Sequence, residues 1–128
     1  MPGYDGERFA PPAPVAEIEI GRAEAGTPHV STLMLIDSGA DITLVPRDVV
    51  NQLGVPLASG RQYELVGFDG TRSFSPAVRL RLQFLGRVFE GLFVLTEQAH
   101  GILGRNILNA IPLVLDGPQL EWSELQRS

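Results

Sequence analysis

The sequence predicts an all-β protein, barrel-like or sandwich-like, and three observations point to it. Apolar and polar residues alternate over several short runs, and turns rich in Gly and Pro separate these runs at short intervals. Only two short stretches have helical spacing. A parallel βαβ fold needs a crossover of a dozen or more residues, usually a helix, between its strands. We therefore expect a single sheet-based domain.

The bulk composition is that of one globular domain. A chain of 128 residues can bury its own core, and no apolar run approaches the roughly 20 residues that span a bilayer. The net charge is -5 and every basic residue is Arg, which argues against nucleic acid or an anionic membrane as the main partner. The absence of Cys excludes disulfides and zinc-thiolate sites. We expect no metal and no cofactor.

Residues 1–14 differ from the rest of the chain. They are rich in Pro, Gly and charged residues, and they lack the basic start and apolar segment of an export signal. We expect a flexible N-terminal arm over 1–14, followed by one folded domain over 15–128. Because no export signal is seen, we also expect a cytoplasmic location.

The expected elements alternate with short turns. Leu85-Gly86 would join two paired strands, and residues 67–71 have the composition of a hairpin tip. Helical spacing occurs at 46–54, which starts with Pro and ends with Gly, and at 104–109. The expected strands are 15–20, 29–36, 42–45, 62–66, 74–84, 87–95, 113–115 and 120–122.

The stretch 33–41 organises the candidate site. A run of large apolar residues leads directly into Asp37, which is followed by Ser38 and Gly39. An acid at the end of a buried strand is neutralised by a partner or kept for chemistry, because an unpaired buried carboxylate costs several kcal/mol or takes up a proton. Asp37 is therefore a candidate catalytic carboxylate.

The residues alone also allow other interpretations of this stretch. Asp37-Ser38-Gly39 could be an Asx turn that bonds its own backbone. A calcium loop would need later ligands and a terminal Glu that are missing. Ser38 as a nucleophile would need His29 or His100 as its base, and neither lies in a recognisable triad pattern.

Two segments together carry a family resemblance. Residues 35–41, Leu-Ile-Asp-Ser-Gly-Ala-Asp, and residues 102–108, Ile-Leu-Gly-Arg-Asn-Ile-Leu, resemble the retropepsin-type aspartic proteases, the single-domain dimeric relatives of pepsin. The similarity covers about 15–122. It implies a retropepsin-like acid-protease barrel with one or two short helices and half an active site per chain. The long C-terminal hairpin is more similar to cellular and bacterial members than to the minimal viral enzymes.

The resemblance implies an aspartic endopeptidase, and the chemistry adds a homodimer. Peptide hydrolysis by this route needs two facing carboxylates that share one proton and activate a water. The chain has one Asp-Ser-Gly triplet, since the sequences after Asp69 and Asp116 have the wrong order. The second carboxylate must then be the partner subunit's Asp37, across a two-fold axis. The partners expected are a second copy and a peptide or protein substrate.

The resemblance also assigns roles around Asp37. Ser38 would bond across the dimer, and Gly39 would give the backbone room beside the carboxylates. Ala40 and Asp41 would face the substrate. The supporting residues would be Gly104, Arg105 and Asn106, with an ion pair between Arg105 and Asp41.

The hairpin between the two motifs resembles the flap that closes over substrate in this family. Its candidate substrate-binding residues are Gly67, Phe68, Asp69 and Gly70. The same residues could form a simple hairpin, and Arg105 with Asp41 could be an ordinary surface pair. The alternative function is a non-catalytic retropepsin-fold dimer that binds peptides or proteins, because a fold does not guarantee an activity.

Overall fold

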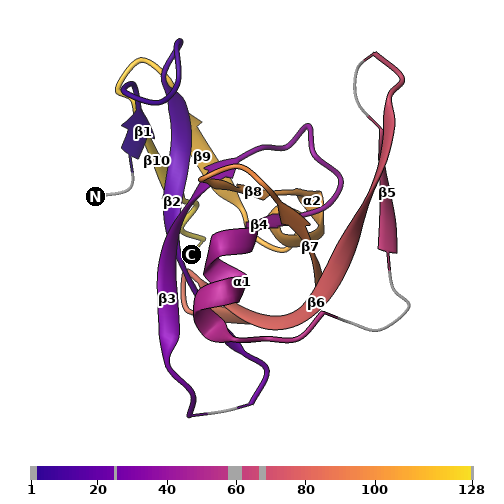
Figure 1. Ribbon diagram of the computed structural model, residues 1–128. Coiled ribbons are helices and arrows are strands. Elements are labelled where there is room, and N and C mark those ends of the chain that lie inside the picture. Colours follow the sequence, from indigo (N-terminus) through magenta and orange to yellow (C-terminus); the bar gives the residue numbers. More distant parts are fainter. Residues whose placement is uncertain (1–2, 25, 58–61, 67–68, 128) are drawn as a thin grey trace.

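The computed structural model describes residues 3–24, 26–57, 62–66 and 69–127. Within these residues the chain forms ten strands and two short helices (Figure 1). The strands are β1 (Gly3–Asp5), β2 (Ala13–Arg22), β3 (His29–Ile36), β4 (Leu44–Pro46), β5 (Gln62–Val66), β6 (Arg72–Phe84), β7 (Arg87–Thr96), β8 (Gly101–Leu103), β9 (Leu113–Asp116) and β10 (Glu121–Glu124). The helices are α1 (Arg47–Leu53) and α2 (Arg105–Leu108).

Six of the strands close into a barrel. Their order is β6-β7-β4-β8-β3-β2, and β2 pairs back with β6 to close the ring. Two extensions leave this barrel (Figure 1). The β5–β6 hairpin projects on one side, while β1, β10 and β9 continue the sheet from β2 on the other. The expected all-β class and the retropepsin-like barrel are confirmed.

Strand β2 shows how the sequence pattern builds the core. Ala16, Ile18 and Ile20 point inward and are buried, whereas Glu17 and Glu19 between them are exposed. Burying an apolar side chain of this size contributes roughly 1.5–3 kcal/mol, so the alternation determines which face turns inward. The largest fully buried apolar side chains, Ile18, Ile20, Met34, Leu80, Leu82, Leu103, Ile107, Val45 and Val78, come from strands around the barrel and from α2.

Helix α1 lies close to its predicted range. Pro46 precedes its first residue, and Val49, Val50 and Leu53 bury one face. Gly54 ends the helix with a φ of 68°, in the left-handed conformation that favours glycine. Among the described residues, no helix has the length and apolar character needed to cross a membrane.

The structure differs from the expected elements at three places. Residues 3–5 form β1, which pairs with β2 and β10, and β2 starts at Ala13, so the expected boundary between 14 and 15 falls inside a strand. The strand expected at 42–45 lies two residues later at its start and one residue later at its end, as β4. Strand β8 is not among the expected strands. Such strands of three residues are too short to show alternation. Flexibility of the N-terminal segment stays a prediction.

Trp122 joins the C-terminal extension to the barrel. Its indole Nε1–H donates to the Val15 carbonyl oxygen at 2.8 Å, and its ring lies 5.7 Å from that of Phe84. This one side chain therefore connects β10 to both β2 and β6.

Replacing Trp122 by Phe should destabilise the fold by about 1–3 kcal/mol, because the Val15 carbonyl loses its donor and the smaller ring fills less space. Urea unfolding followed by circular dichroism measures the loss. The control Val88→Ala removes an exposed apolar side chain and should change stability by less than about 0.5 kcal/mol. Equal losses in the two variants would contradict the role given to Trp122.

Candidate functional site

The position of Asp37 is determined by β8. Strand β3 runs parallel to β8, with Met34 opposite Gly101 and Ile36 opposite Leu103. Directly after β3, the Asp37 N–H donates to the Leu103 carbonyl oxygen at 3.1 Å. The residue that begins the turn is therefore still held by the barrel.

The turn after β3 closes on the Asp37 side chain. The Gly39 N–H donates to Asp37 Oδ1 at 2.9 Å, and the Ala40 N–H donates to the Asp37 carbonyl oxygen at 3.1 Å. A Cβ at Gly39 would lie 3.1 Å from the same Oδ1, so a side chain there would crowd the carboxylate. The Asx-turn hydrogen bond considered as an alternative is thus present, and it orients the carboxylate.

Asp37 is half-buried, and Ser38 and Gly39 are exposed. The carboxylate therefore lies where the interior of the barrel meets the surface, at the end of a strand. Oδ1 accepts the Gly39 N–H, while Oδ2 accepts no hydrogen bond from the described residues. One carboxylate oxygen is positioned and the other is available.

Arg105 holds the turn from 67 residues downstream. Its backbone N–H donates to the Ala40 carbonyl oxygen at 2.8 Å, and its Nη1 donates to the Ser38 carbonyl oxygen at 2.8 Å. The expected ion pair with Asp41 is not formed in the described part of the chain, where Asp41 is exposed. The guanidinium bonds to the backbone of the turn instead.

Thr43 links the turn to α2. This side chain is 1% exposed; its Oγ1 donates to Asn106 Oδ1 at 2.7 Å and accepts the Gly104 N–H at 3.0 Å. Sequence reasoning treated Thr43 only as part of a β-branched strand. Thr43 is the one hydroxyl residue in an apolar run, and a buried hydroxyl needs hydrogen-bond partners. This pattern could have indicated its role.

Gly104 is required by close packing. A Cβ at this position would clash with the backbone carbonyl of Ile42. The α2 segment can therefore approach the acidic turn only with glycine before Arg105. Together these contacts join Gly104, Arg105 and Asn106 to residues 38–43, which follow Asp37.

The candidate flap forms a regular hairpin from β5 and β6, with Val66 opposite Arg72. Gly67 and Phe68 lie outside the described residues. Asp69 Oδ1 accepts the Thr71 N–H at 2.9 Å, and Gly70 has a φ of 82°. Hydrogen bonds from the Thr71 side chain and backbone hold the pKa of Asp69 below its ordinary value. These contacts indicate that Asp69 orders the turn at the tip of the hairpin.

One face of this hairpin carries two exposed apolar side chains beside an ion pair. Glu64 lies opposite Phe74 and Val66 opposite Arg72, so these four side chains share a face. Val66 and Phe74 are each 65% exposed, and Arg72 Nε lies 3.2 Å from Glu64 Oε1. The hairpin therefore offers uncovered apolar surface away from the barrel.

The arrangement around Asp37 can hold one carboxylate in a defined orientation at a surface of the chain. In the described residues, no group of three or more His, Cys, Asp or Glu side chains is placed to hold a metal ion. Peptide hydrolysis by the two-carboxylate route would need a second acid beside Asp37.

Solved structures with the same architecture identify the fold. EIAV protease, complexed with the inhibitor HBY-793, aligns with a TM-score of 0.58 and 22% identity over 77% of this chain and 86% of that chain. The solution structure of Simian Foamy Virus (mac) protease aligns with a TM-score of 0.51 and 21% identity, over 74% and 91%. No family model and no curated protein matches the sequence. The chain has the retropepsin fold.

Replacing Thr43 by Val should lower the free energy of unfolding by about 1–3 kcal/mol, since the buried Gly104 N–H would lose its acceptor while the side-chain shape is kept. Thr43→Ser is the matched control, because it keeps the hydroxyl and loses only a methyl group. Urea unfolding compares the two. A serine variant less stable than the valine variant would show that the methyl group matters more than the hydrogen bonds.

Proposed function

We propose that this chain is an aspartic endopeptidase in which Asp37 and the partner subunit's Asp37 activate a water at a homodimer interface. The observation that carries the proposal is the Asp37-Ser38-Gly39 turn, held by Arg105 through the Ser38 and Ala40 carbonyls. An acid whose turn is held in this way keeps one carboxylate oxygen available for chemistry. The retropepsin fold supports the same assignment.

The reaction needs both carboxylates in different protonation states. The charged one removes a proton from water, and the water oxygen attacks the scissile carbonyl carbon while the protonated one donates to the carbonyl oxygen. The C–N bond then breaks as the amine takes up a proton. Two charges about 3 Å apart repel by roughly 5–6 kcal/mol at an effective dielectric of about 20, so the pair keeps one proton.

The end of the sheet supports a second copy as partner. β9 is last in the strand order and pairs only with β10 among the described residues. Leu115 lies opposite the buried Trp122 and thus on the same sheet face, yet it is 52% exposed. A two-fold contact between β9 edges would cover this face. Other exposed apolar residues nearby in sequence are Val114, Leu120 and Leu125.

The β5–β6 hairpin supports an extended and apolar substrate. Val66 and Phe74 offer apolar surface on one face, and the hairpin acts as the flap. Ala40 and Asp41, directly after the catalytic turn, and Asp69 and Gly70 at the tip are the described residues proposed to contact substrate. The hairpin would exclude water from the dyad when it closes.

Asp37→Asn should lower peptide cleavage by about 100-fold to 10,000-fold, because the amide can neither share nor transfer the catalytic proton. A library of fluorogenic peptides assayed between about pH 3 and 8 measures the activity, and analytical ultracentrifugation shows whether the dimer is kept. The control Asp48→Asn changes an exposed acid on α1 and should leave cleavage unaltered.

Unchanged cleavage in Asp37→Asn would reject the dyad. If a demonstrated wild-type dimer cuts no peptide at any pH tested, the non-catalytic binding module becomes the better description.

Leu115→Glu should convert the dimer into a monomer and lower cleavage in parallel, because the new charges would face each other across the proposed two-fold contact. Sedimentation equilibrium measures the association. Val88→Glu places the same charge at an exposed apolar position on the β6–β7 hairpin and should leave the dimer intact. A Leu115→Glu dimer as stable as the wild type would place the interface elsewhere.

A further inference from the structure

A strip of half-buried apolar side chains leads away from Asp37 on the outer face of the barrel. Met34 and Ile36 of β3 are buried in the core. The alternate residues of this strand, Leu33 and Leu35, therefore lie on the outer face, where both are half-buried. Asp37 continues the alternation, because its N–H still bonds to the carbonyl oxygen of the last residue in β8 at 3.1 Å. Its side chain thus shares a face with these two leucines.

The neighbouring strands widen this strip. Val15 of β2 and Ile102 of β8 both lie opposite Leu35, one on each side, and both are half-buried. Gly101 fixes the direction in β8, since a Cβ there would meet the core side chain of Met34. The next residue, Ile102, therefore points outward. Apolar side chains from three strands border the turn after β3 on this face.

Phe9 lies at the far end of the strip, against His100. This histidine comes one residue before the pair of Gly101 with Met34, and so lies at the level of Leu33. The two rings pack edge to face, with their centroids 5.1 Å apart and their planes at 75°. Phe9 is half-buried, whereas the other residues of its loop, 6–8 and 10–12, are exposed. The loop between β1 and β2 therefore directs one aromatic ring toward the barrel.

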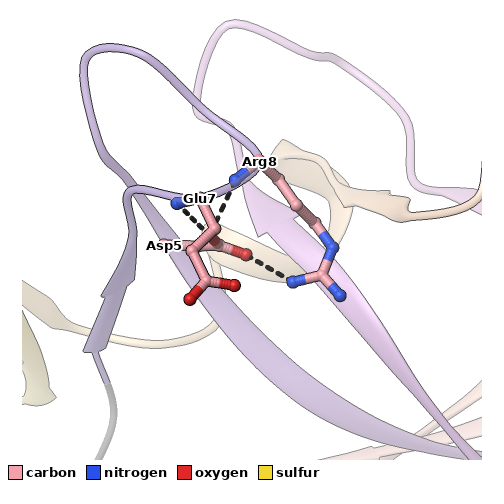
Figure 2. A network of polar contacts seen from close by, with 3 residues as sticks. All are labelled: Asp5, Glu7 and Arg8. Carbon is pink, nitrogen blue, oxygen red and sulfur yellow. Dashed lines mark hydrogen bonds and ion pairs between the residues drawn. The ribbon is translucent and has the colours of Figure 1, made fainter.

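Asp5 orders the loop that carries Phe9 (Figure 2). Its Oδ1 accepts the Glu7 N–H at 2.8 Å and the Arg8 N–H at 3.0 Å, and its Oδ2 accepts Arg8 Nη1 at 2.7 Å. The Arg8 backbone N–H, and then the Arg8 side chain, hold the pKa of Asp5 below its ordinary value, so this carboxylate is charged at neutral pH. These contacts orient the backbone directly before Phe9.

We propose that Phe9 is a specificity-determining residue that contacts an apolar side chain of an extended peptide lying along this strip, an inference that rests on the proposed function. Alternate side chains of an extended peptide share a face and lie roughly 7 Å apart. The four residues of β3 from the level of His100 to Asp37 span about 13 Å, so two such side chains fit. One lies beside Leu35 and Ile102, and the other meets the Phe9 ring. A phenylalanine side chain reaches that ring, whereas the shorter valine side chain does not.

The probes are two capped octapeptides in which threonine alternates with phenylalanine or with valine. Isothermal titration calorimetry measures their binding to the full chain carrying Asp37→Asn, which prevents cleavage. Phe9→Ala in this background should weaken binding of the phenylalanine probe about threefold to tenfold, the size of one aromatic contact, and of the valine probe by less than about twofold. Asp5→Ala should give the same selective loss more weakly, because it releases the loop but keeps the ring.

Val88→Ala is the control, since it removes an exposed apolar side chain on β7 and should leave the binding of both probes unaltered. Circular dichroism checks that all variants are folded. Equal weakening of the two probes by Phe9→Ala would overturn the inference, and so would unchanged or absent binding of the phenylalanine probe. Failure of the proposed function has a different result: a wild-type chain that cuts no peptide, while Phe9→Ala still shows the selective loss, would reject the proteolysis alone.

Discussion

The hydrogen bonds between Arg105 and the turn after β3 are the contacts on which the site depends. The turn has local hydrogen bonds to Asp37, and contacts from outside the turn hold it against the α2 segment. Arg105 does this through two carbonyl oxygens, those of Ser38 and Ala40. Thr43 and the tight approach of Gly104 hold the α2 segment in place while it does so.

The same contacts define what one chain contributes to the proposed catalytic centre. They orient one carboxylate at a surface of the chain and leave one of its oxygens available. In the proposed enzyme the second acid comes from a second copy, which would also cover the exposed apolar surface around Leu115. Catalysis and association are therefore linked in the proposed enzyme, since neither the dyad nor the covered sheet exists in one subunit.

Strand β2 links the barrel to its C-terminal extension. It closes the barrel by pairing with β6, and it carries β1 and the C-terminal strands on the same edge. Its inward residues build the core, whereas its outward residues Glu17 and Glu19 are exposed.

The sequence by itself determined the all-β class, the range of helix α1, the terminal hairpin and the turn that carries Asp37. Each of these depends on a local pattern, such as alternation, a helix-ending glycine or an apolar run that ends in an acid. The tertiary structure decided what Arg105 bonds, that Thr43 joins the two halves of the site, and that short strands such as β1 and β8 exist. These features depend on contacts between residues far apart in the chain, which form only when the barrel closes. A local sequence pattern cannot predict such contacts.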